Sequence, residues 1–136
     1  MAALALHVTD EALGDFLSVY NPAVRALRVQ VPWLALPTFE FRVWLSGLSA
    51  AVFVLFALSP LLYRGSRTLR AGGYLFGAIM ALNALGHLIG SLVVGRLLPG
   101  VYSSPLLLAA AVVLLRALVR SHPAGESFSQ GGRPTK

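Results

Sequence analysis

Residues able to do chemistry gather in two short stretches of this 136-residue chain. The first stretch holds His7, Asp10 and Glu11, and the second holds Asn83 and His87. Residues three or four apart lie on one face of an α-helix, so each stretch would present a polar stripe to one side. Ionisable groups inside an apolar helix bundle face its interior, where they mark functional sites. The two stripes are therefore the candidate site.

Two histidines and a carboxylate form a ligand set that leaves positions open for water or substrate. His7, Glu11 and His87 would hold a single divalent zinc, iron or manganese ion. Asp10 would be a fourth ligand or would orient an imidazole from outside, and Asn83 would hydrogen-bond a bound group. A centre of two metals is disfavoured because the chain has only three histidines.

Two other interpretations use the same residues without a metal. Burial brings a carboxylic acid and an imidazole toward similar proton affinities, so Glu11 and His87, helped by Asp10, would isomerise an isoprenoid- or sterol-like lipid. In the other interpretation the polar groups form a hydrogen-bond network in a non-catalytic membrane subunit or assembly protein. An open cavity beside the cluster favours an enzyme, and a closed, fully bonded cluster favours the network.

The elements that position these residues are apolar enough for a membrane. Hydrophobic residues make up 57% and charged residues 12% of the chain, against about 45–50% and about 25% in soluble domains. Spans of about 20 apolar residues are predicted over 41–63, 70–97 and 102–120. A fourth helix is predicted over 2–20, ending at Asn21-Pro22, with its carboxylates turned inward.

The predicted fold is thus all-α, a multi-pass membrane bundle of three clear transmembrane helices plus the N-terminal helix that carries the acidic motif. This helical domain covers residues 1–122, and residues 123–136 form a disordered polar tail. Residues 21–40 are predicted to be an interfacial loop or a short surface helix. Glu11 lies nine residues before Tyr20, and His87 ten before Leu97, so at 1.5 Å per residue both lie roughly 14–15 Å deep and can meet.

Charge indicates partners and orientation. The net charge is +6, but the basic residues lie at helix ends instead of forming a patch with aromatic residues, which argues against nucleic acid. The lipid bilayer and a lipid-soluble small molecule are the expected partners. Basic residues are more numerous on one side, which predicts a cytoplasmic position for both chain termini. That side carries Arg64, Arg67, Arg70, Arg116, Arg120, Arg133 and Lys136.

Two pairs of glycines, Gly73/Gly77 and Gly86/Gly90, have the spacing that lets helix backbones approach closely in lipid. They predict helix contacts within the bundle, or across a homo-oligomer or another membrane complex. The chain has no cysteine, and it contains no phosphate-binding loop, dinucleotide fingerprint or serine-hydrolase motif. Its alanine, leucine and arginine content is typical of a GC-rich bacterial genome.

Residues 7–11, His-Val-Thr-Asp-Glu, resemble the signature of the HXXEE-domain family of small integral membrane proteins. Residues 83–87 and 96–105 are similar to that family's Asn-xxx-His helix and its following turn, here Arg-Leu-Leu-Pro-Gly and then Val-Tyr-Ser-Ser-Pro. The resemblance covers most of residues 5–120 and implies a small membrane bundle with a polar site and no established reaction. Asp10 departs from the family, which usually has glutamate there, and Glu11 matches its second acid.

Ser103 and Ser104 before Pro105 are predicted only to cap the last span.

Overall fold

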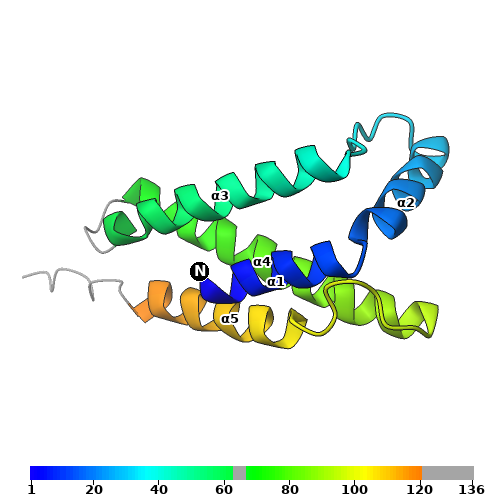
Figure 1. Cartoon of the computed structure of the whole chain (residues 1–136). Helices are drawn as coiled ribbons and strands as arrows, with labels where there is room; N and C mark the ends of the chain where they lie inside the picture. Colours follow the sequence, from blue (N-terminus) through cyan, green and yellow to red (C-terminus); the bar gives the residue numbers. More distant parts are fainter. Residues whose placement is uncertain (63–66, 121–136) are drawn as a thin grey trace, which may run out of the picture.

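In residues 1–62 and 67–120, the part that the structure, a computed structural model, describes, the chain forms helices joined by turns and loops (Figure 1). The five helices are α1 (Ala2–Leu13), α2 (Phe16–Gln30), α3 (Phe41–Leu62), α4 (Arg67–Val94) and α5 (Ser104–Arg120). The all-α prediction is therefore confirmed. The predicted tail over 123–136 lies outside the described residues.

Four of the helices run side by side, and α2 leaves them at an angle (Figure 1). The closest pair is α4 and α5, and α1 lies against both α3 and α5. The chain begins at the end of the bundle where α4 starts and α5 finishes (Figure 1). The core lies where α1, α4 and α5 meet, and it consists of Leu4, Val8, Ala84 and Leu107.

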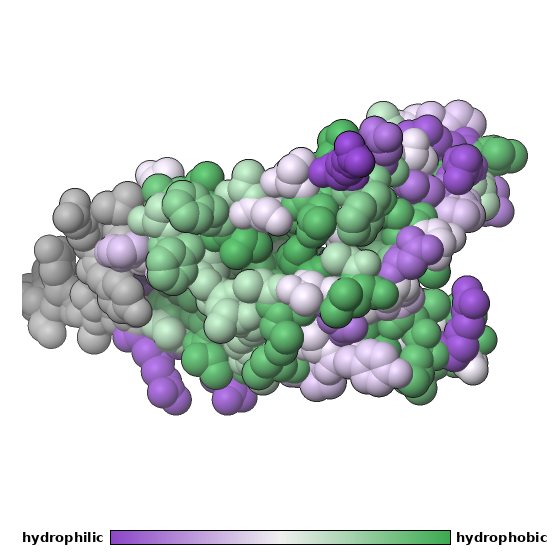
Figure 2. Space-filling model, viewed as in Figure 1, coloured by the Kyte–Doolittle hydropathy of each residue, from purple (hydrophilic) through white to green (hydrophobic). Residues whose placement is uncertain are grey.

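Two helices, α3 and α4, are long and apolar enough to cross a membrane, over Phe41–Pro60 and Thr68–Val94. Large apolar side chains on both helices are exposed, among them Phe53 and Phe56 on α3 and Leu75 and Leu82 on α4. In Figure 2 apolar residues cover most of the visible face along the helices, and hydrophilic residues gather around α2. Since α5 has 17 residues and α1 has 12, the arrangement of four spans stays a prediction.

The predicted single helix over 2–20 is wrong, because the chain breaks between α1 and α2. Asp15 adopts left-handed backbone angles with φ 55°. A Cβ on Gly14 would lie 2.8 Å from the Cβ of Pro99, so the 95–103 turn packs directly on this break. The predicted stop at Asn21-Pro22 is also wrong. Pro22 falls in the second turn of a new helix, where its missing N–H removes only one backbone bond.

A loop over 31–40 joins α2 to α3 and folds back on α2. The side-chain amide of Asn21 donates to the carbonyl of Phe39 and accepts from its N–H, at 2.9 and 3.0 Å. The Tyr20 hydroxyl donates to the Pro37 carbonyl at 3.0 Å, and Arg28 donates to the carbonyl of Leu36. Two alternatives were predicted for residues 21–40. The surface helix describes residues 21–30, which belong to α2, and the loop describes residues 31–40.

The two glycine pairs on α4 have different surroundings. A Cβ on Gly77 would lie 2.8 Å from a methyl carbon of Leu115, so Gly77 lets α4 and α5 approach within one chain. Gly86 is exposed with open space around it, and a Cβ on Gly90 would meet Leu98 at 3.1 Å. Oligomerisation through Gly86 and Gly90 stays a prediction.

Candidate metal centre

The structure brings together three of the predicted site residues, His7 and Glu11 from α1 and His87 from α4. The Nε2 atom of His87 lies 2.9 Å from Glu11 Oε1, and the Nε2 atom of His7 lies 3.4 Å from the same oxygen. The three side chains can each offer a ligand atom within 4.8 Å of the other two. They are buried, with exposed fractions of 1% for His7, 4% for Glu11 and 7% for His87.

These residues meet because each lies on the face of its helix that enters the core. On α1, residues 4, 7, 8 and 11 form one stripe in which His7 and Glu11 alternate with the core residues Leu4 and Val8. On α4, Asn83 and His87 flank Ala84, which is fully buried. The predicted equal depth of Glu11 and His87 assumed a helix that ends at Tyr20. That assumption was wrong, because α1 ends at Leu13. Packing of the apolar positions sets the register instead.

A chain of hydrogen bonds fixes the tautomer of His7. The Ser103 hydroxyl donates to Asp10 Oδ2 at 2.7 Å, and the Ser103 N–H donates to the same oxygen at 2.9 Å. Since the hydroxyl has one proton, and a carboxylate attracts it more strongly than the Gly100 carbonyl at 3.2 Å, its oxygen accepts from His7 Nδ1 at 2.8 Å. Neutral imidazole has one N–H, so Nε2 of His7 carries a free electron pair.

The electron pair on His7 Nε2 accepts a hydrogen bond from Asn83. Its side-chain Nδ2 donates to His7 Nε2 at 2.9 Å. A cation bound between the two histidines would compete with this amide for the same nitrogen. Asn83 therefore lies beside the ligand atoms, where the sequence placed it, as a group that can contact whatever they bind.

Ser103 is the site residue that the sequence analysis missed, because its place before Pro105 indicated only a helix cap. The neighbouring Ser104 donates its hydroxyl to the carbonyl of Gly100 at 2.6 Å, a contact within the turn. Ser103 reaches across to α1 and is 6% exposed. Asp10 contacts Ser103 and lies outside the group of three possible ligands. Of its two predicted roles, this position favours orientation of an imidazole over direct ligation.

The remaining walls of the site come from the 95–103 turn and from aromatic rings. Gly100 has φ +86°, and a Cβ there would lie 2.8 Å from His87 Cε1 and 3.0 Å from Glu11 Cγ. The ring of Phe16 lies 5.6 Å from the His87 ring and 5.8 Å from that of Trp44, between centroids. Backbone thus covers one side of His87, and an aromatic ring covers another.

The contact at Gly100 can be separated from its backbone strain. Gly95 also has a positive φ, +68°, but a Cβ there meets nothing within 4 Å. We expect Gly95→Ala to cost about 1–2 kcal/mol through strain alone. Gly100→Ala should cost about 1–3 kcal/mol more because it also overpacks the site. Thermal unfolding of both variants in detergent, followed by circular dichroism, measures the difference, and equal losses would contradict close packing at Gly100.

The cluster is closed to solvent. Among residues 1–60 and 68–120, no buried side-chain nitrogen or oxygen lacks a hydrogen-bond partner. A substrate would have to displace side chains to reach His7, Glu11 or His87, so the open cavity that would favour an enzyme is not found beside these residues in the described part of the chain. Their ligand atoms lie close enough together to hold an ion. Two nitrogen or oxygen ligands about 2.0–2.1 Å from a tetrahedral zinc lie about 3.3–3.4 Å apart, close to the 2.9 and 3.4 Å found here.

Compared with known protein families, curated proteins and solved structures, the chain matches none of them. Membership of the HXXEE-domain family is therefore an expectation from the sequence motifs alone. The function is therefore inferred from the geometry of the site.

Proposed function

We propose that this chain is an integral membrane protein that binds a single divalent metal ion at His7, Glu11 and His87. The observation that carries the proposal is the convergence of these three buried side chains on one small volume. Two imidazoles and one carboxylate suit zinc, iron or manganese and leave coordination positions open. The resemblance of residues 7–11 and 83–105 to HXXEE-domain proteins points to the same kind of molecule.

The surroundings of His7 support a role as a ligand. Histidines that bind metals usually donate their second N–H to an oxygen, which fixes the tautomer and raises the basicity of the ligating nitrogen. His7 meets this condition through Ser103, and Asp10 accepts the Ser103 proton. The carboxylates of Glu11 and Asp10 would also balance the two charges of the cation, which matters in a buried site.

The membrane part of the proposal rests on α3 and α4. Both helices have the length and composition of a span, and only 6% of the apolar window on α3 is buried inside the molecule. Contiguous apolar surface of this extent is uncommon on soluble monomers. Lipid around α3 and α4 would cover it.

Metal content of the purified chain tests the function. We expect about one equivalent of zinc, iron or manganese by elemental mass spectrometry of the protein in detergent. His7→Ala and His87→Ala should lose it, and Asn83→Leu should keep it, because Asn83 lies outside the group of three ligands. Circular dichroism of each variant controls for folding. A well-folded wild type without metal would contradict the proposal and leave a hydrogen-bond network as the role of these residues.

A further inference from the structure

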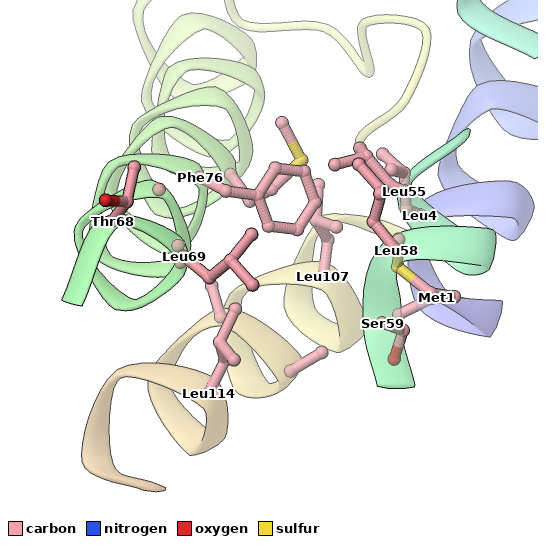
Figure 3. A pocket seen from close by; sticks show the side chains of 17 residues that line it. Met1, Leu4, Leu55, Leu58, Ser59, Thr68, Leu69, Phe76, Leu107 and Leu114 are labelled. Atoms are coloured by element: carbon pink, nitrogen blue, oxygen red, sulfur yellow. The ribbon is translucent and has the colours of Figure 1, made fainter. Parts of the chain in front are cut away.

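An apolar cavity of about 330 Å³ lies between α1, α3, α4 and α5, apart from the metal ligands (Figure 3). Its size falls at the lower end of the range of about 300–1,000 Å³ that is usual for small-molecule sites. Among the described residues, its lining includes leucine, phenylalanine and methionine side chains and no charged side chain, and Met1, the first residue of the sequence, is part of the wall. The hydroxyl groups of Ser59 and Thr68 are its polar side-chain groups.

Small residues on two facing helices create this space. Gly72, Gly73 and Gly77 line it from α4, and Ala110 and Ala111 line it from α5. These glycines and alanines have no side chain long enough to fill the space between α4 and α5. The cavity therefore follows from the sequence of α4 and α5.

The mouth of the cavity lies between the two helices that have the length of membrane spans. Leu58 near the end of α3, and Thr68 and Gly72 near the start of α4, all line the cavity and are exposed. A molecule entering there would come from the side of the bundle. In a bilayer this side faces lipid chains.

Basic residues surround the same end of the bundle. Arg70 is near the start of α4, and Arg120 closes α5. The Arg70 side chain donates to the carbonyl of Leu118 at 3.4 Å, which places it beside the last turn of α5. Neither arginine is among the residues that line the cavity, so the polar side-chain groups at the mouth are the hydroxyls of Ser59 and Thr68, which can donate hydrogen bonds to a lipid ester.

One part of the cavity lies one helical turn from the metal ligand His7. Leu4 lines the cavity there and precedes His7 by three residues on α1. Met80 and Leu107 also line it, three residues from Asn83 and Ser104. Leu4 and Leu107 are buried and belong to the core. One layer of core side chains therefore separates the cavity from the site.

We propose that this cavity holds one acyl chain of a bilayer phospholipid. The chain enters between α3 and α4, with the ester beside the hydroxyl groups of Ser59 and Thr68. Its methyl end lies against Leu4 and Leu107. The inference rests on the membrane location in the proposed function and is independent of metal binding.

Photolabelling of the full chain in lipid nanodiscs tests this proposal. The discs contain phosphatidylcholine with a trace of the same lipid carrying a diazirine near the methyl end of one acyl chain. We expect labels on Leu4 and Leu107 themselves, located by tandem mass spectrometry, because these residues are buried and annular lipid does not reach them. Gly72→Leu should remove these labels by filling the cavity, since a Cβ at Gly72 meets nothing within 4 Å.

Gly86→Leu is the matched control, because Gly86 is also exposed on α4, has open space around it and does not line the cavity. It should leave the labels on Leu4 and Leu107 unchanged. Labels confined to exposed residues such as Phe53 and Leu92, or equal labelling of Gly72→Leu and wild type, would overturn the proposal. Release of the chain from cell membranes by alkaline carbonate would overturn the membrane location itself, whatever the metal content.

Discussion

Replacing Glu11 with glutamine is expected to lower the affinity for a divalent metal by more than about a hundredfold. Mutations of groups that only orient metal ligands typically cost about 10–100-fold, and Glu11 is the charged member of the ligand set itself. Glutamine keeps the shape of the side chain, so the packing against His87 and Gly100 is preserved. Titration against a chelator of known affinity measures the change.

Glu40→Gln is the matched control, because it removes the same charge from an exposed position that precedes α3. Its metal affinity should equal that of wild type. If Glu11→Gln bound metal as tightly as Glu40→Gln, the carboxylate would not be a ligand, and the metal centre would have to be assigned elsewhere.

Replacing Ser103 with alanine is expected to lower metal affinity by about 10–100-fold without removing a ligand. The Ser103 hydroxyl joins Asp10 to His7 Nδ1, so its loss frees the imidazole to change tautomer and leaves a buried N–H without an acceptor. An unsatisfied buried group of this kind also costs about 1–3 kcal/mol of stability. Metal titration and thermal unfolding of the same preparation measure both effects.

Ser103→Thr should restore much of the affinity, because threonine keeps the hydroxyl. Ser104→Ala removes a neighbouring hydroxyl that donates only to the Gly100 carbonyl. It should lower stability while leaving metal affinity near the wild-type value. Equal losses of metal affinity in Ser103→Ala and Ser104→Ala would mean that the turn matters for folding and that the contact with His7 has no special role.

Much of the helical framework could be predicted because long apolar runs with clear turn signals dominate this sequence. The prediction of a helix over 41–63 agrees with α3 within the described residues, and that over 102–120 is close to α5. The break at Gly14 could not be predicted from residues 2–20 alone. It depends on the approach of Pro99, which is far along the chain.

The polar site could likewise be predicted where it depends on local spacing, but not where it depends on contacts between distant parts of the chain. The spacing of His7 with Glu11 and of Asn83 with His87 was sufficient to predict two stripes, since helix periodicity is a local property. Which residues complete the site depends on the fold of the 95–103 turn. Ser103 resembles an ordinary capping serine in the sequence, and only the packing of that turn on α1 turns its hydroxyl toward Asp10 and His7.

The order in which the site can assemble follows from the length and position of α1. This helix has 12 residues, about 18 Å at 1.5 Å per residue, so it cannot cross a bilayer by itself. It carries Asp10 and Glu11, whose charges are costly in lipid without partners. Its hydrogen-bond partners Asn83, His87 and Ser103 are 76 to 96 residues further along the chain. In the proposed membrane location, α1 therefore cannot dock until α4 and α5, which follow it in the chain, are in place, and its docking completes the site.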